Sequence, residues 1–421
     1  MKKTIIALLL GLVAMSAGAQ TARKDFIGAW TGKLKAGDMS LAIVLHFEEK
    51  GDSLRCLLDS PDQGAKGIPA AIDFMSEDSV AVNVKMAGVT YRGRIREGRL
   101  NGTFAQSGLS FPLVLDKGEQ EVRRPQNPAT PYPYTTEEVV FSNEADHATL
   151  AGTLTYPVGF EGMKKRSVPV VLMVTGSGPE NRDEEVFDHK PFLVIADYLA
   201  RNGIASLRYD DRGFGASTGG DRIGNDATSA DNMRDAAAGI NYLRSTKRFG
   251  RVGVLGHSEG GNIAFMLGAA KVVDFAISMA GAGVKGDTAL TAQVNRIMEL
   301  QGQTTKMNTG QFRKTAQAQH NAWLDWFIDY DPAADIAATK CPVLAINGDK
   351  DCQVVSEVNL AGIRQALPKN KKSVVKEYAS LNHLFQHCQT GLNTEYRGIE
   401  ETIAQEVLND IAEWINKTVK R

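Results

Sequence analysis

Six consecutive residues near the middle of the chain, GHSEGG at positions 256–261, have the composition of a nucleophile turn. They follow the apolar run 252–255 and precede a run that favours a helix. A serine on a sharp strand-to-helix turn exposes its hydroxyl, and glycines two residues before and after it let the strand and the helix approach closely. The helix N-terminus also favours developing negative charge. The pattern predicts Ser258 as a nucleophile; a glycine-rich turn without a catalytic role is the alternative.

A serine nucleophile needs a base, and that base needs an acid to orient it. Downstream, the apolar run 343–346 leads into NGDKD at 347–351, which places carboxylates just past the end of a predicted strand. We predict Asp351 as the acid, with Asp349 as the alternative. The segment LNHLFQ at 381–386 places His383 in the loop expected for the base, and His387 is its rival.

The tetrahedral intermediate of acyl transfer needs backbone donors for its oxyanion. One predicted donor is the N–H of Glu259, which directly follows the nucleophile. The segment TGSGP at 175–179 follows the apolar run 168–174, and its glycines permit close approach of the backbone to a substrate. We predict the N–H of Ser177 as the second donor; a tight turn without a catalytic role is the alternative.

The elements that must position these residues alternate between strands and helices from about residue 135 onward. Apolar strands are predicted at 168–174, 204–209, 252–255, 275–279 and 343–346, with helices at 192–202 and 227–244 between them. Continuous apolar strands separated by helices indicate an α/β fold with a mostly parallel sheet covered on both faces. A long insert at about 282–339 is expected to form helices over the rim of the sheet.

The first part of the chain has a different pattern. Residues 25–118 contain short β-branched or alternating runs separated by turn dipeptides, which predicts a small all-β sandwich or barrel. The segment FIGAWTG at 26–32 is similar to the opening strand of lipocalin-like modules. Four prolines between 125 and 133 then predict a semi-rigid linker at 119–134, followed by a catalytic domain at 135–421.

The N-terminus has the pattern of a signal peptide: Lys2 and Lys3, an apolar run at 5–15, and Ala-Gly-Ala at 17–19. We expect cleavage after residue 19 and export to the periplasm or the outside of the cell. The apolar run is too short to span a bilayer, so no membrane insertion is expected after cleavage. The formal net charge of −1 gives no electrostatic reason to expect nucleic acid as a partner. No sequence feature indicates an oligomeric state.

The four cysteines, Cys56, Cys341, Cys352 and Cys388, lack the spacing of metal ligands, so we predict no metal site. Export permits oxidation, and Cys352 and Cys388 flank the predicted acid and base. A bridge between these two cysteines and a pair of free thiols are both compatible with the sequence.

Several motifs together resemble a group of bacterial secreted carboxylesterases in the α/β-hydrolase superfamily. They are TGSGP followed by NRDE at 175–184, RYDDRGFGAS at 208–217, GHSEGG, NGDKD and LNHLFQ, in the family's order. The group is also similar to prolyl-oligopeptidase-type peptidases and dienelactone hydrolases. The resemblance covers about 135–421 and implies hydrolysis of carboxylic esters, often with short acyl chains, without a metal or cofactor. Thr175 replaces the histidine that commonly starts the oxyanion loop, and Asp211 and Arg212 are expected to support the elbow by ion pairing.

The sequence therefore predicts a serine carboxylesterase that acts on a small-molecule ester. A serine peptidase or acyl-peptide hydrolase is the first alternative, although 25–118 are too few residues for the β-propeller usual in prolyl-oligopeptidase relatives. A catalytically inactive binding protein is the second alternative, against which the complete set of Ser258, Asp351, His383 and oxyanion glycines argues.

Overall fold

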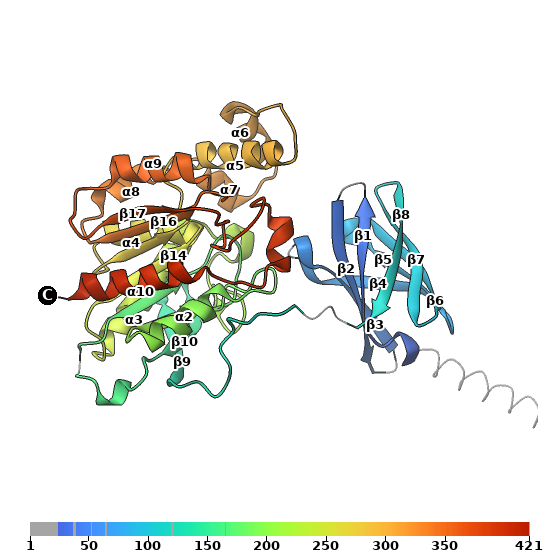
Figure 1. The fold of residues 1–421 in the computed structure, drawn as a ribbon, viewed down its shortest axis with the longest axis horizontal. Coiled ribbons are helices and arrows are strands. Elements are labelled where there is room, and N and C mark those ends of the chain that lie inside the picture. Colours follow the sequence, from blue (N-terminus) through green and yellow to red (C-terminus); the bar gives the residue numbers. More distant parts are fainter. Residues whose placement is uncertain are drawn as a thin grey trace, which may run out of the picture. The chain divides into compact units, whose positions relative to one another are not determined.

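The computed structural model describes residues 24–36, 39–51, 53–63, 65–118, 122–164 and 166–420. The predicted signal peptide lies outside the described residues. The chain divides into two compact units, Met1–Arg123 and Arg124–Arg421, so the boundary falls inside the predicted linker (Figure 1). Within the described residues, no helix has the length and apolar character needed to cross a membrane.

The first unit is a closed antiparallel barrel of eight strands in sequential order. Its strands are β1 (Gly28–Ala36), β2 (Met39–Lys50), β3 (Ser53–Ser60), β4 (Ala65–Met75), β5 (Ser79–Val84), β6 (Val89–Arg96), β7 (Arg99–Gln106) and β8 (Leu109–Lys117). Pairing of Thr31 with Asp116 closes the barrel between β1 and β8. Alternate residues of β5 are buried, and the interior contains Trp30, Phe47 and Tyr91. The prediction of a small all-β domain is confirmed, as a barrel and not as a sandwich.

The second unit contains a nine-stranded sheet in the order β13-β10-β12-β11-β14-β15-β16-β17, with β9 paired to β10. Its strands are β9 (Thr136–Asn143), β10 (Ala148–Thr155), β11 (Val170–Val174), β12 (Ala205–Tyr209), β13 (Thr218–Gly219), β14 (Val252–His257), β15 (Ala276–Met279), β16 (Val343–Gly348) and β17 (Val374–Tyr378). Six neighbouring strands of the sheet are parallel, namely β12, β11, β14, β15, β16 and β17. The strands β9, β10 and β13 pair antiparallel. This strand order, with helices on both faces, confirms the predicted α/β-hydrolase fold.

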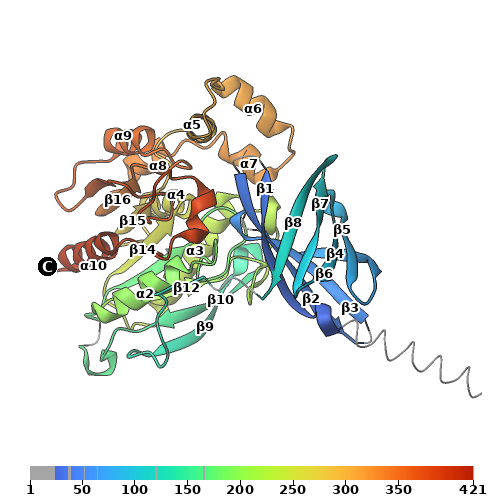
Figure 2. The ribbon, with the colours of Figure 1, turned by 45° about the vertical axis from the view of Figure 1, so that its right-hand side comes forward.

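Helices cover the two faces of this sheet (Figure 2). They are α2 (Pro191–Arg201), α3 (Ser229–Ser245), α4 (Glu259–Ala269), α5 (Gly286–Leu300), α6 (Thr309–Gln317), α7 (Ala322–Phe327), α8 (Ala333–Ala338), α9 (Ser356–Ala366) and α10 (Gln405–Val419). Val170 and Leu172 pack in one core with α3, α4, α8 and α9, whereas Val171 and Met173 pack in another with α2 and α10. Because successive side chains of a strand point to opposite faces, a run that is apolar throughout fills both cores.

The predicted insert at 282–339 forms four helices, of which α8 belongs to the core of the sheet. Ile336 on α8 is fully buried in the same core as α4 and α9. The aromatic residues of α7 instead form a small cluster with the start of α5. The part of the insert outside the core therefore consists of α5, α6 and α7.

The direction in which strands are added to the sheet reverses at β11. The chain runs from β11 to β12 on one side and then returns to β14 on the other side of β11. In open α/β sheets, ligands bind beyond the carboxyl ends of the strands where the strand order reverses. The loops that follow β11 and β14 meet at this position, and they contain Ser177 and Ser258.

Candidate active site

Ser258 occupies a strained turn between β14 and α4. Its φ of 54° and ψ of −117° are unfavourable for a residue with a side chain, at a cost of about 1–3 kcal/mol. The turn also requires glycine on both sides. A Cβ on Gly256 would lie 1.8 Å from the carbonyl oxygen of Gly260, and a Cβ on Gly260 would lie 2.1 Å from that of Val174. The glycine spacing in the sequence therefore has a direct steric cause.

His383 and Asp351 form a buried hydrogen-bonded pair. His383 Nδ1 lies 2.7 Å from Asp351 Oδ2, and the two residues are 4% and 1% exposed. The other carboxylate oxygen of Asp351 accepts hydrogen bonds from the backbone N–H groups of Gln353 and Val354, each at 2.8 Å. Asp351 is thus fixed from both sides, and Nε2 of His383 is left for another partner.

The two alternative residues have different surroundings. Asp349 is exposed, and its carboxylate accepts a hydrogen bond from the N–H of Ser380 at 2.6 Å, which holds the turn. His387 is exposed on its side chain and pairs with Glu401, its Nδ1 lying 2.8 Å from Oε2. Neither residue takes part in the His383–Asp351 pair.

The loop after β11 reaches the nucleophile. A Cβ on Gly176 would lie 3.4 Å from the Cβ of Ser258, so this backbone passes directly beside the serine. Ser177 follows in the same loop, and Glu259 is the first residue of α4. The structure thus places the two predicted oxyanion residues on the two segments that border Ser258.

Asp211 supports this loop rather than the elbow. Its carboxylate accepts hydrogen bonds from Thr175 Oγ1, at 2.9 and 3.0 Å from the two oxygens, and from the N–H of Glu180 at 2.8 Å. Thr175, which replaces the common histidine, is therefore the residue that Asp211 holds. Burial raises the pKa of Asp211 to about 8.

The expected support of the elbow by Arg212 is wrong. Its guanidinium donates to both carboxylate oxygens of Asp235 at 2.7 Å and to Asp146 at 2.9 Å. Arg212 is 2% exposed, and it joins the start of α3 to the segment between β9 and β10. Because a buried guanidinium must be paired, this position is determined by the acidic residues on those elements.

Sequence reasoning missed a second buried histidine–carboxylate pair beside the first. His257 Nδ1 lies 2.8 Å from Glu184 Oε1, and His257 Nε2 lies 2.9 Å from the carbonyl oxygen of His383. Burial by itself would lower the pKa of His257, but Glu184 and the His383 carbonyl together raise it. Because its two ring nitrogens bond to Glu184 and to the His383 carbonyl, His257 ties the elbow to the loop of His383. The only signal in the sequence was the position of Glu184 in the NRDE segment.

The side chain of Glu259 connects the elbow to the insert. Its Oε2 accepts a hydrogen bond from Trp323 Nε1 on α7 at 2.7 Å. Burial raises the pKa of Glu259 to about 7. Burial, together with Glu184, Asp211 and Glu259, also raises the pKa of Glu180 well above its ordinary range. The cause is the same for both residues, since burial disfavours the charged form of a carboxyl group.

The cysteines of the described structure are free thiols. Cys352 donates to the carbonyl of Gly391 at 3.1 Å and Cys388 to that of Ser380 at 3.5 Å, so the structure contains no bridge between these two. In the described residues, no three His, Cys, Asp or Glu side chains are grouped in a way that could hold a metal ion.

Comparisons with known proteins give a family match and matches to individual proteins. Residues 190–323 match the model of a family described as serine aminopeptidase, S33. The chain is 24% identical over 280 residues to Esterase EstD from Thermotoga maritima, and the match covers 64% of this chain and 66% of that protein, just under two thirds of its length.

Two solved esterase structures are also similar. Est1E from Butyrivibrio proteoclasticus with bound ferulic acid has 16% identity and a TM-score of 0.46, over 67% of this chain and 100% of that chain. The esterase Pf2001 of Pyrococcus furiosus has 16% identity and a TM-score of 0.46, over 72% of this chain and 100% of that chain. The strand order and the sequence similarities therefore support an α/β hydrolase that is similar to esterases.

Proposed function

We propose that this protein is an exported serine carboxylesterase with Ser258 as nucleophile, His383 as general base and Asp351 as orienting acid. The observation that supports it most is the buried His383–Asp351 pair, joined through His257 to the strained turn of Ser258. The similarity to an esterase supports the same type of reaction.

In the proposed mechanism, Ser258 Oγ attacks the ester carbonyl carbon while its proton passes to Nε2 of His383. The resulting oxyanion accepts hydrogen bonds from the N–H groups of Ser177 and Glu259. The bond from carbon to the alcohol oxygen then breaks, and His383 returns the proton to that oxygen. Water repeats these steps on the acyl-serine and releases the carboxylic acid.

A fluorophosphonate probe and a short-chain aryl ester test this proposal. The wild-type protein should hydrolyse the ester without added metal, and peptide mapping should find the probe on Ser258. Ser258→Ala should lose both activities. Ser245→Ala should keep both, because this serine is exposed at the end of α3 and bonds only to the carbonyl of Tyr242 among the described residues. Probe on another residue, or full activity in Ser258→Ala, contradicts the assignment.

A serine aminopeptidase is the second candidate, because the matching family model has that description. Aminoacyl 4-nitroanilides distinguish the two activities when they are assayed beside aryl esters of the same acyl groups. A kcat/KM for the amides equal to or above that for the esters favours the peptidase.

Export is proposed from the pattern of residues 1–19. Mature protein recovered from the producing bacterium should begin at Gln20. Intact Met1 on the accumulated protein, or its retention with the cytoplasmic fraction, contradicts export.

A further inference from the structure

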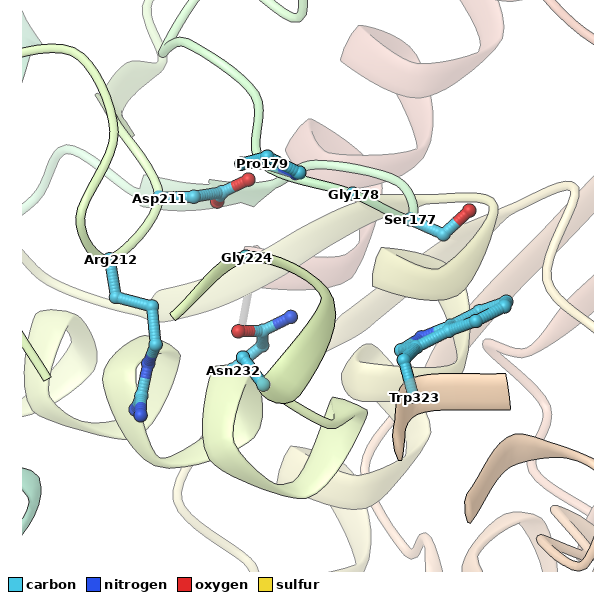
Figure 3. A pocket seen from close by; sticks show the side chains of 9 residues that line it. Ser177, Gly178, Pro179, Asp211, Arg212, Gly224, Asn232 and Trp323 are labelled. Atoms are coloured by element: carbon cyan, nitrogen blue, oxygen red, sulfur yellow. The ribbon is translucent and has the colours of Figure 1, made fainter. Parts of the chain in front are cut away.

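A cavity of about 220 Å³ lies between the loop after β11 and helix α7 (Figure 3). Ser177 and Pro179 line it from the loop, Asp211 and Arg212 from the segment after β12, Asn232 from the first turn of α3, and Trp323 from α7. This volume is below the roughly 300–1,000 Å³ of pockets for drug-sized ligands. It exceeds the roughly 150 Å³ of a cavity that holds benzene. The cavity has room for one substituted six-membered ring.

The cavity adjoins the proposed oxyanion loop, and the course of the proposed reaction assigns it to the acyl side. In the proposed function, the alcohol leaves on the side of His383, because that residue gives it a proton. Ser258, His383 and Asp351 do not line the cavity, whereas Ser177 of the proposed oxyanion loop does, so the cavity adjoins that loop. With the carbonyl oxygen held by the loop and the alcohol on the histidine side, the remaining substituent is the acyl chain.

Trp323 presents a fixed aromatic wall to this cavity. Its indole N–H is bonded to Glu259, and its ring is stacked on Phe327 with centroids 5.0 Å apart and an interplanar angle of 14°. Figure 3 shows the indole below Ser177, and the Asn232 amide between Trp323 and Arg212. An aromatic surface held from two sides is suited to contact with a flat ring.

The polar groups of the cavity suit a neutral substituent with a hydroxyl group. Asn232 offers an amide that both donates and accepts. Asn232 and Ser229 also interact with the buried carboxyl of Glu259, which fixes the position of the amide at the cavity wall. The guanidinium of Arg212 donates to Asp235 and Asp146, and its remaining bonds go to backbone carbonyls, so its charge is already paired and does not favour an anionic acyl group.

We infer that this cavity is an acyl pocket for esters of single-ring carboxylic acids that carry a hydroxyl group, with Trp323 and Asn232 as specificity-determining residues. The inference rests on the proposed function, because it assumes acyl transfer to Ser258. It goes beyond that function by naming the acyl group, which the sequence motifs do not determine.

The kinetic test compares 4-nitrophenyl acetate, benzoate, 4-hydroxybenzoate and decanoate, which share one leaving group. Trp323→Ala should lower kcat/KM for benzoate by at least about tenfold more than for acetate, since it removes the buried contact area of the ring. Asn232→Leu should lower the ratio of hydroxybenzoate to benzoate by about tenfold, the effect of one lost hydrogen bond. Trp326→Phe is the matched control, because Trp326 stacks on Tyr330 and does not line the cavity. Equal losses for all four esters, or a preference for decanoate over benzoate, overturn the inference.

A binding measurement separates failure of the inference from failure of the proposed function. Methyl 4-hydroxybenzoate is titrated by calorimetry into Ser258→Ala and into the same chain with Trp323→Ala or the milder Trp323→Phe. Circular dichroism confirms that each variant is folded. Binding that weakens at least about tenfold with Trp323→Ala supports the pocket even if no ester is hydrolysed. The inference is overturned if Ser258→Ala does not bind the ester, or if adding Trp323→Ala leaves binding unchanged, even if aryl acetates are good substrates.

Discussion

Replacement of Asp351 by asparagine removes the negative charge of the side chain but keeps the hydrogen bonds that hold it in place. Oδ1 of Asp351 accepts two backbone hydrogen bonds, from Gln353 and Val354, and an asparagine carbonyl keeps both. The new amide nitrogen then faces Nδ1 of His383, which lies 2.7 Å from Oδ2 in the wild-type structure. Because two N–H groups cannot share one hydrogen bond, the ring must change to the tautomer with its proton on Nε2. That tautomer cannot accept the proton of Ser258.

The expected loss follows from this change of tautomer. A comparable replacement in a serine protease lowers kcat by about 10⁴, which corresponds to about 5.4 kcal/mol in the activation free energy. The free energy of unfolding should fall by only about 1–3 kcal/mol, because one charge-assisted hydrogen bond is lost and the backbone bonds remain. Asp349→Asn is the matched control. Asp349 is exposed and bonds to Ser380, so kcat should change by less than about threefold.

Both variants are assayed with an aryl acetate between pH 6 and 9, and with a fluorophosphonate whose labelling rate reports the nucleophile directly. Asp351→Asn should lose ester turnover and labelling by similar factors. Thermal unfolding checks that each variant is folded. A folded Asp351→Asn protein with near wild-type kcat, or a larger loss in Asp349→Asn, refutes the assignment.

Three further changes test other parts of the structure. Gly260→Ala should unfold at a clearly lower temperature in a thermal melt, because its Cβ would meet a carbonyl oxygen at 2.1 Å, whereas Gly398→Ala, with open space at its Cβ, should match the wild type. Glu184→Gln removes the partner that raises the pKa of the buried histidine in the elbow. The pair stabilises the wild-type protein fully below the ordinary histidine pKa of about 6.5, and this stabilisation is lost as pH rises through the raised pKa. In urea titrations, Glu184→Gln should therefore lower the free energy of unfolding by about 1–3 kcal/mol at pH 6 and by less at pH 9. A chain that starts at Thr135 should melt at least about 4 °C below one that starts at Arg124, because Arg124 donates to four backbone carbonyls of the second unit; equal melting temperatures contradict this.

The sequence predicted those features that depend on neighbouring residues. The period of the apolar residues located the central strands and the helices α2 and α3 to within a few residues. The glycines around Ser258 predicted the strand-to-helix turn, since backbone contacts at 1.8 and 2.1 Å exclude any side chain at those two positions. The alternating pattern of residues 25–118 predicted an all-β unit, but a period of two is common to sandwiches and barrels. Closure through the pairing of Thr31 with Asp116 distinguished them.

The tertiary structure alone decided which distant groups meet. His383 pairs with Asp351 rather than Asp349, because Asp351 lies at the buried end of its turn and Asp349 at the exposed side. Asp211 bonds to Thr175 on the neighbouring strand's loop, although its sequence neighbour Arg212 turns to α3.

The tertiary structure also decided two contacts that no sequence motif predicted. Glu184 reaches His257 across 73 residues, and Trp323 reaches Glu259 across 64. Local sequence fixes the backbone conformation of each segment, because φ, ψ and apolar period depend on near neighbours. The order of strands in the sheet and the path of each loop depend on how all segments bury their apolar faces together. These long-range contacts, which surround the proposed nucleophile and the cavity beside it, therefore exist only once the sheet has formed.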